Sequence, residues 1–198
     1  MRVKLFSIVI VLAVAAMLTT SVSATEEDYY SAAAAYYKTT TDVIDYLVST
    51  DMPIDEIPVI LHIADRADVS PEKIAEQRGE GESWMEIVRN HDLDARVFKY
   101  MVVGDLNSEK YTPPFERFKT TPRRDWNQIE FTDKEIVNLV NLKFIYSHND
   151  YSVYEVIAMR DSGKDFVTIN DKVRITKYEM TKAEEAKRWE LAKAEKNK

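Results

Sequence analysis

The chain has no cysteine among its 198 residues. It therefore forms no disulfide, has no thiol nucleophile, and holds neither cysteine-ligated zinc nor covalently attached haem. Glycine is also scarce, with four residues in all. Because sheet-rich folds need more glycine in their turns, the composition favours helices, and packing alone must hold the core together.

Sequence motifs of the common enzyme classes are missing as well. There is no HExxH zinc motif and no GxSxG nucleophile elbow, and RGEGES (78–83) has the wrong spacing for a dinucleotide fingerprint. Glu56 and Glu86 recur at equivalent repeat positions, as a carboxylate pair of a glycosidase would, but helix capping accounts for their spacing. The sequence predicts no catalytic residue, no cofactor and no resident metal, and therefore a protein that is not an enzyme.

Long apolar runs are limited to the N-terminal segment 1–24. Two basic residues precede an apolar run at 5–18, and small residues precede the expected cut, which is typical of a secretory signal peptide (1–24) cleaved after Ala24. The run is shorter than the roughly 20 residues that a membrane-spanning helix needs, so an uncleaved anchor is the minor alternative. We expect a periplasmic or secreted protein with no membrane span after cleavage.

Basic residues are fewer than acidic residues. Lys and Arg number 27 against 34 Asp and Glu, and the formal charge of −7 becomes −9 when the two basic residues of the signal peptide leave. The stretch SPEKIAEQRGEGESWMEIV (70–88) has the pattern of a helix-turn-helix, but it carries Glu80, Glu82 and Glu86 where DNA would lie. Since DNA binding needs clustered Lys and Arg, we predict no nucleic-acid partner and interpret this stretch as a packing unit.

The chain contains an internal repeat. Residues 60–93 lie over residues 142–175 without a gap, and the matches fall at structural positions. The matched pairs are Ile63 with Ile145, Asp68 with Asp150, Ser70 with Ser152, Ile74 with Val156, Arg78 with Arg160, Gly81 with Gly163, Trp84 with Phe166 and Ile87 with Ile169. Each unit is predicted to be a helix, a turn, a short helix, a glycine turn and a further short helix that opens on the ring residue.

Capping residues predict where these helices begin and end. Ser70 and Ser152 are expected N-caps, and Gly81 and Gly163 supply the left-handed residue that ends the short helix. In a capping box, the cap and the third helical residue each bond the other's backbone. Boxes are predicted for Ser83 with Glu86, Thr132 with Glu135 and Ser152 with Glu155.

A weaker echo of the unit lies upstream of the first copy. Its matches are Thr40, Ile44, Asp51, Pro53, Glu56 and Ile57 over Ser70, Ile74, Gly81, Ser83, Glu86 and Ile87. We therefore predict an all-α fold of tandem helix-turn-helix-like repeats in one compact domain, with peripheral N- and C-terminal helices. The predicted boundaries are an N-terminal helical arm (25–39), a repeat domain (40–175) made of repeat 1 (about 53–93), a connector (94–131) and repeat 2 (132–175), and a charged C-terminal helix (176–198).

Three stretches carry a resemblance to a known group of proteins: VSPEKIAEQRGEGESWMEIV (69–88), PPFERFKTTPRRDW (113–126) and DKEIVNLVNLKFI (133–145). They resemble small exported bacterial proteins of unknown function that are built from helix-turn-helix-like repeats, over about 55–175. The resemblance implies export and a repeated helical fold, and it implies no activity. The chain departs from that group in the glutamates around its glycine turn and in its long charged tail.

Three histidines are the whole imidazole supply of the chain. His91 and His148 are predicted near the C-terminal ends of helices, where the helix dipole favours a partly protonated ring. His62 lies among core residues and is predicted to be a satisfied or edge histidine. Asp92 and Asp150 leave metal binding by one of these histidines open as an alternative, although the histidines occupy non-equivalent repeat positions.

The connector holds the best candidate for a binding surface. Guanidinium forks beside aromatic faces suit carboxylate, phosphate or sugar ligands. The candidate ligand or partner surface consists of Phe115, Arg117, Phe118, Lys119, Arg123, Arg124 and Trp126. The structural alternative is that the arginines pair with surface carboxylates while the rings hold the loop to one repeat.

These observations predict an exported, non-enzymatic helical protein, acting as a protein-interaction or scaffold module of the cell envelope with an envelope protein as partner. Both end helices are expected to be available to that partner. One alternative is a binder of an anionic small ligand or cell-wall glycan through residues 113–126. Another is an enzyme of unrecognised type, for which His91 or His148 would have to lie beside a carboxylate in a closed polar pocket.

Overall fold

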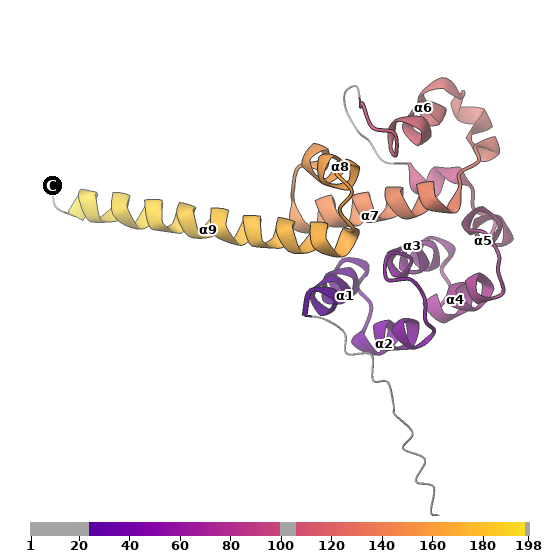
Figure 1. Ribbon diagram of the computed structural model, residues 1–198, viewed down its shortest axis with the longest axis horizontal. Coiled ribbons are helices and arrows are strands. Elements are labelled where there is room, and N and C mark those ends of the chain that lie inside the picture. The colour runs from indigo at the N-terminus through magenta and orange to yellow at the C-terminus, as the bar shows by residue number, and fades with distance from the viewer. Residues whose placement is uncertain (1–23, 100–105, 197–198) are drawn as a thin grey trace, which may run out of the picture.

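The computed structural model describes residues 24–99 and 106–196, and all regular structure in these ranges is helical (Figure 1). The helices are α1 (Ala24–Tyr37), α2 (Thr41–Ser49), α3 (Ile57–Ala67), α4 (Pro71–Gly79), α5 (Trp84–Asn90), the 3-10 helix η1 (Ala95–Phe98), α6 (Thr112–Thr120), the 3-10 helix η2 (Arg123–Gln128), α7 (Asp133–Asn149), α8 (Val153–Asp161) and α9 (Phe166–Lys196). The predicted all-α class of tandem helix-turn-helix-like repeats is confirmed. No helix in these ranges is both long and apolar enough to cross a membrane. The predicted signal peptide (1–24) lies outside the described residues except for Ala24.

Helix α7 forms the centre of the fold and contacts α1, α3, α5, α8 and α9. Every residue from 136 to 142 is buried, so α7 has no solvent-facing side over this stretch. The stretch includes Asn141, whose amide nitrogen donates to the carbonyls of Asp55 and Val137 at 2.8 Å each. The amide oxygen of Asn141 accepts from the hydroxyl of Tyr29, so this buried polar side chain is satisfied.

The helix boundaries repeat in the same register as the sequence. Helices α4 and α8 each span nine residues, and the helices after them, α5 and α9, begin at Trp84 and Phe166. Helices α3 and α7 both end before an aspartate in the left-handed region, Asp68 (φ 55°) and Asp150 (φ 50°). Trp84 and Phe166 are fully buried, as expected for rings that fill the angle between two helices.

Most of the predicted caps are confirmed. The side chains of four N-cap residues each accept a hydrogen bond from the backbone N–H three residues further on: Ser70, Ser83, Thr132 and Ser152. Gly81 and Gly163 have φ of 95° and 91°, which is the left-handed conformation that glycine adopts without strain. The capping boxes of Ser83 with Glu86 and of Thr132 with Glu135 are complete.

Two predictions about glutamates are wrong. Ser152 accepts from the backbone of Glu155, but the reciprocal half of that capping box is not formed. Burial and, to a smaller extent, the Glu155 carboxylate raise the pKa of the Tyr151 hydroxyl. Glu56 is not a capping side chain either, because it makes no cap bond at the start of α3 and pairs with Arg78. The upstream echo therefore extends over α2 and its ends, and α3 begins three residues later than the echo predicts.

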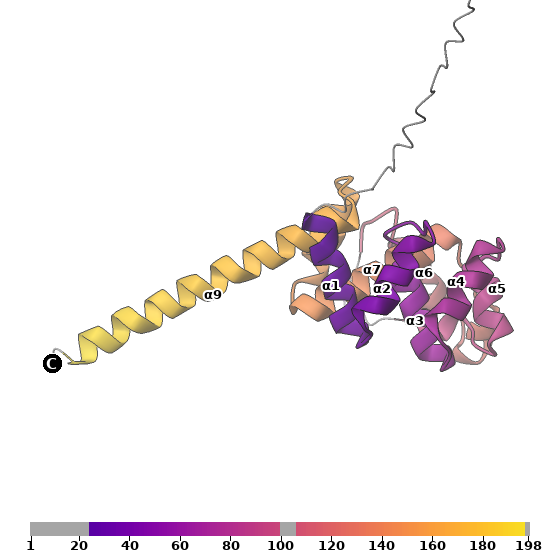
Figure 2. The same cartoon turned by 90° about the horizontal axis from the view of Figure 1, so that it is seen from below.

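Of the two end helices, only α9 leaves the body of the molecule (Figure 2). Helix α1 contacts α2, α3, α7 and α9, and its Tyr29 and Ala33 are fully buried, so it is part of the core and not a free arm. Helix α9 joins the last predicted helix of repeat 2 and the predicted C-terminal helix into one helix of 31 residues. Between Val173, which is buried, and Trp189, no side chain is buried.

Candidate functional site

The aromatic residues of the candidate surface pack inwards. Phe118 and Trp126, on α6 and η2, are each 8 % exposed, and their ring centroids lie 5.3 Å apart. Phe118 also lies 5.4 Å from the ring of Phe131, and the indole N–H of Trp126 donates to the carbonyl of Thr121 at 2.9 Å. Phe115 is half-buried against the same core. The rings thus hold the connector to the body, in the way that the structural alternative describes.

Arg117 is engaged by the protein itself. Its guanidinium donates to both carboxylate oxygens of Glu135, at 3.0 and 2.7 Å, and to the carbonyl of Glu130 at 3.1 Å. Burial opposes ionisation of Glu135, but the bonds from Arg117 and from Thr132 outweigh it and lower the pKa of that carboxyl. Arg117 therefore fastens α6 to the start of α7, and a ligand would have to displace this bidentate pair.

The other cations of the connector lie at the surface. Lys119 forms an ion pair with Glu116 at 3.1 Å, and Arg124 forms one with Asp125 at 3.4 Å. The guanidinium of Arg123 lies 5.5 Å from the ring centroid of Trp126. Arg123 and Arg124 are exposed, so a ligand would meet these two residues first.

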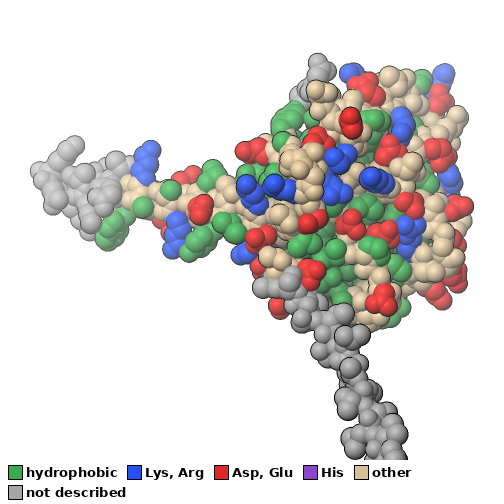
Figure 3. All heavy atoms as spheres, in the orientation of Figure 1, with side chains coloured by type: hydrophobic (Ala, Val, Ile, Leu, Met, Phe, Trp, Pro, Cys, Tyr) green, Lys and Arg blue, Asp and Glu red, His purple; other side chains and the backbone are tan. Residues whose placement is uncertain are grey.

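The projecting part of α9 carries large apolar side chains in contact with solvent. Tyr178, Met180 and Trp189 are 63 %, 58 % and 64 % exposed. Lys182 lies over the ring of Tyr178 at 5.6 Å. Hydrophobic and charged side chains alternate along this helix in the space-filling view (Figure 3). The sequence predicts this helix as a charged tail, and its aromatic residues are not part of the candidate surface.

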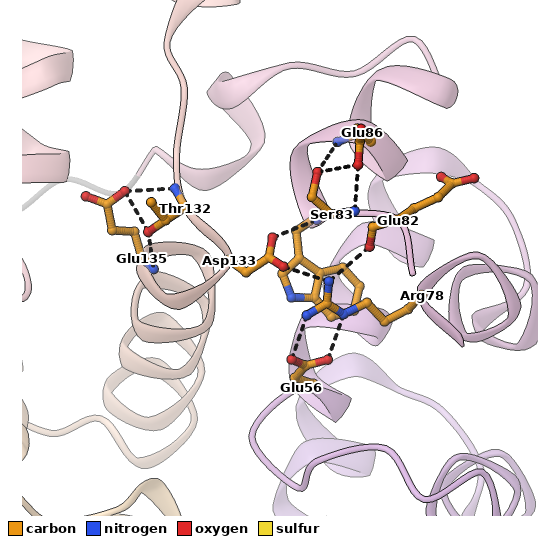
Figure 4. A network of polar contacts seen from close by, with 9 residues as sticks. Glu56, Arg78, Glu82, Ser83, Glu86, Thr132, Asp133 and Glu135 are labelled. Carbon is orange, nitrogen blue, oxygen red and sulfur yellow. Dashed lines mark hydrogen bonds and ion pairs between the residues drawn. The ribbon is translucent and has the colours of Figure 1, made fainter. Parts of the chain in front are cut away.

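A polar network lies where α3, α4, α5 and α7 meet (Figure 4). Its centre is Arg78, and we name Arg78 together with the residues that it contacts the first arginine node. Arg78 donates from Nε and from a terminal nitrogen to the two carboxylate oxygens of Glu56, each at 2.9 Å. Another bond, of 2.9 Å, goes to the carbonyl of Glu82, and the guanidinium lies 4.5 Å from the ring centroid of Trp84. The bonds to Glu56 are the main reason why the pKa of Arg78 is raised, so its charge is permanent.

Asp133, the first residue of α7, completes the first arginine node. One of its carboxylate oxygens accepts from Arg78 at 2.7 Å, and the other accepts from the backbone N–H of Trp84 at 2.9 Å (Figure 4). A single carboxylate thus binds a guanidinium and the first amide of α5. Since Asp133 belongs to the second repeat, this contact fixes the two repeats to each other.

The second repeat contains an equivalent second arginine node, centred on Arg160. The guanidinium of Arg160 donates to the carbonyl of Lys164 at 3.0 Å and lies 4.2 Å from the ring centroid of Phe166. Its Nε donates to the side-chain oxygen of Asn138 at 3.1 Å. Asn138 is the residue of the second repeat that is equivalent to Glu56, because it follows Glu56 at the same distance as Arg160 follows Arg78. Extending the sequence repeat upstream from position 60 to position 56 would have revealed these equivalent partners of the two arginines.

Two of the histidines lie where the sequence predicts. His91 is the C-cap of α5, and its Nε2–H donates to the amide oxygen of Gln77 at 2.7 Å. His148 lies in the last turn of α7 beside the rings of Tyr36 and Phe144. Burial and the charge of Lys177 lower the pKa of His148, which opposes the protonation that the helix dipole favours.

His62 is a buried core histidine, in agreement with the prediction of a satisfied residue. It is 5 % exposed, and its Nε2–H donates to the carbonyl of Val97 at 2.9 Å, which joins α3 to η1. Burial lowers the pKa of His62 from 6.5 to about 4. The unfolded chain therefore takes up a proton that the folded chain does not, and the contribution to stability is lost as the pH falls from about 6.5 towards 4.

We expect His62 alone to lower the free energy of unfolding by about 2 kcal/mol between pH 7.5 and pH 4.5. The variant His62→Gln keeps an N–H donor for Val97 but does not titrate. Urea unfolding of both proteins at the two pH values measures the effect, because all other titrating groups are shared. The difference in free energy of unfolding between the wild type and the variant should change by this amount, in favour of the variant, at pH 4.5. A difference that is the same at both pH values would contradict the lowered pKa of His62.

Comparison of the chain with models of protein families, with curated proteins and with solved structures gives no match. The resemblance to small exported helical-repeat proteins stays a prediction. Among the described residues there is no group of three or more His, Cys, Asp or Glu side chains placed to hold a metal ion. The function of the chain must therefore be inferred from its own contacts and exposed surfaces.

Proposed function

We propose that this protein is an exported, non-enzymatic interaction module of the cell envelope, and that it binds a partner protein through the projecting part of α9. The observation that carries this proposal is the exposure of Tyr178, Met180 and Trp189, each more than half exposed, on a helix that extends away from the body (Figure 1). Tyrosine and tryptophan are enriched among the few residues that dominate binding at protein interfaces. An isolated helix of this kind is only marginally stable in water, so a partner that buries it would also stabilise it.

The charge of α9 indicates the chemistry of the partner. Residues 176–198 contain seven Lys and Arg against five Glu, whereas the whole chain carries a net charge of −7. The tail is thus slightly basic on an acidic molecule. We propose a partner with an acidic surface that includes an apolar groove, because opposite potentials speed association and reject other partners.

The contacts of the candidate residues support this choice over the alternatives. In the connector, Arg117 is bound to Glu135 and the rings of Phe118 and Trp126 are buried, which leaves Arg123 and Arg124 for an anionic ligand or glycan. Such a ligand would contact two exposed arginines that are not part of a binding pocket in the described part of the chain. The histidines that an enzyme would use are engaged structurally or lie beside aromatic rings.

Site-specific photo-crosslinking tests the proposal. A photoreactive phenylalanine analogue replaces Trp189 in the full chain in its native cells, and the control carries it at Tyr154, which is 47 % exposed on α8. We expect one dominant adduct from position 189 and none from position 154, and excess unlabelled protein should abolish it. With the identified partner purified, Trp189→Ala should weaken binding about tenfold or more and leave the free energy of unfolding within about 0.5 kcal/mol.

Two results would contradict this function. Equal adducts from the two positions would mean non-specific contact, and no adduct from position 189 would exclude α9 as the binding element. An adduct with a second copy of the chain would replace the envelope partner by self-association through the same helix.

A further inference from the structure

The first arginine node shows how this repeat binds a carboxylate. Asp133 accepts one hydrogen bond from the guanidinium of Arg78 and one from the backbone N–H of Trp84. The two donors come from the end of one helix and the start of the next, and the turn at Gly81, with φ 95°, brings them together. Two donors that face two oxygens are the geometry that a carboxylate requires.

The second node has the same two donors without the carboxylate. Arg160 uses two of its five N–H donors, one on Asn138 and one on the carbonyl of Lys164. No described residue accepts a hydrogen bond from the remaining donors of Arg160 or from the backbone N–H of Phe166. The turn between the donors is the same, since Gly163 has φ 91°.

The second node lies just below the surface. Gly163 and Asp165 are exposed and Arg160 is half-buried, whereas Phe166 is 1 % exposed. Asp55 and Asp165 lie within electrostatic range of Arg160, but neither forms an ion pair with it in the described structure. These two carboxylates disfavour a doubly charged anion such as phosphate at the node. A singly charged carboxylate, as in the first node, fits the local charge better.

We propose that the second arginine node is a carboxylate-binding site in which the guanidinium of Arg160 and the backbone N–H of Phe166 donate to the two oxygens of the ligand. The carboxylate is supplied either by an aspartate or glutamate in the first turn of a partner's helix, as Asp133 is in the first node, or by a free small carboxylate. The site lies at the start of α9 and does not depend on the projecting tail.

Amide shifts in nuclear magnetic resonance spectra of the ¹⁵N-labelled mature chain (25–198) test the site. One probe is a peptide of residues 129–138, which contains Asp133, and its control is the same peptide with Asp133→Asn; the other probe is acetate. We expect the peptide to shift the N–H of Phe166 and the Nε–H of Arg160 saturably, and the control peptide to bind about tenfold more weakly or worse. The N–H of Trp84 should not move, because Asp133 already occupies the first node.

Protein variants separate the site from general charge effects. Arg160→Gln should abolish the shift at Phe166, and Arg160→Lys should weaken it, because lysine keeps the charge but loses the planar fork. Arg124→Gln removes the same charge from an arginine that is 85 % exposed elsewhere, and binding should stay unchanged. If acetate saturates the site with the same dependence on Arg160 and the peptide binds no more tightly than acetate, the ligand is a free small carboxylate. Three results would overturn the site. The first is a shift that persists in the Arg160→Gln variant, and the second is an equal shift with both peptides together with no response to acetate. The third is the absence of any shift with every probe.

Discussion

Replacing Arg78 with methionine is expected to lower the free energy of unfolding by about 3 kcal/mol, measured by urea denaturation at pH 7. The substitution leaves the carboxylate of Glu56, whose side chain is 15 % exposed, without its bidentate partner. Asp133 loses its bond to the guanidinium as well, and the contact between the two repeats is weakened. The expected loss is at the low end for a broken buried ion pair, because the Asp133 side chain is 36 % exposed and water takes over part of its solvation.

The equivalent residue of the second repeat provides the matched control. Arg160→Met removes the same side chain from the same position of the unit, but its partners are the amide oxygen of Asn138 and a backbone carbonyl. No charge is left buried, so we expect a loss of about 1 kcal/mol. Equal losses for the two variants would show that stacking on Trp84 and Phe166, and not the ion pair, provides the stability of the nodes.

Local features of the fold could be predicted from sequence because their causes are local. An N-cap such as Ser83 bonds a backbone N–H three residues away, and a residue such as Gly81 ends a helix by its own conformation. The same reasoning fails when a tertiary contact competes for the side chain. Glu56 has the spacing of a capping residue, but the guanidinium of Arg78, 22 residues further along the chain, offers two charge-assisted bonds.

The contacts of the candidate surface cannot be predicted from the sequence in the way that the helix ends can, and the reason is physical. Basic and aromatic residues close in sequence indicate a binding surface only if they face solvent. In the connector, Arg117 finds its carboxylate 18 residues away on α7, and Trp126 is buried against Phe118. Neither contact follows from composition or periodicity, since both depend on how the connector folds back over the repeats. The aromatic residues of α9 can be read from the sequence, but their exposure follows only from the course of the helix away from the body.

For the same reason, the sequence does not show that the predicted arm at residues 25–39 packs on the core. An alanine-rich helix with tyrosines on one face has a weak apolar stripe, and its sequence does not show which surface it covers. The structure supplies that surface in Phe144 of α7, whose ring centroid lies 5.5 Å from Tyr29 and 5.6 Å from Tyr36. Burial of Tyr29 also raises the pKa of its hydroxyl, which therefore stays protonated as the donor to Asn141.

Phe144→Ala is expected to cost about 4 kcal/mol in the free energy of unfolding, the largest effect predicted for a single side chain here. Phe144 is fully buried, and its ring contacts three tyrosines of α1 and His148. Its removal leaves a cavity between α1 and α7, and α1 should lose hydrogen-exchange protection before the rest of the fold does. Urea unfolding measures the total loss, and exchange of the amides of α1 shows where it falls.

Tyr178→Ala is the matched control for Phe144→Ala, because it truncates an aromatic side chain that is 63 % exposed on the projecting part of α9. We expect the free energy of unfolding to change by less than about 0.5 kcal/mol and the protection of α1 to stay the same. If Phe144→Ala also cost less than about 1 kcal/mol, well below the usual range for a buried phenylalanine, α1 would be a dispensable arm after all. The large loss, together with early exchange in α1, would establish that the first helix completes the core around α7.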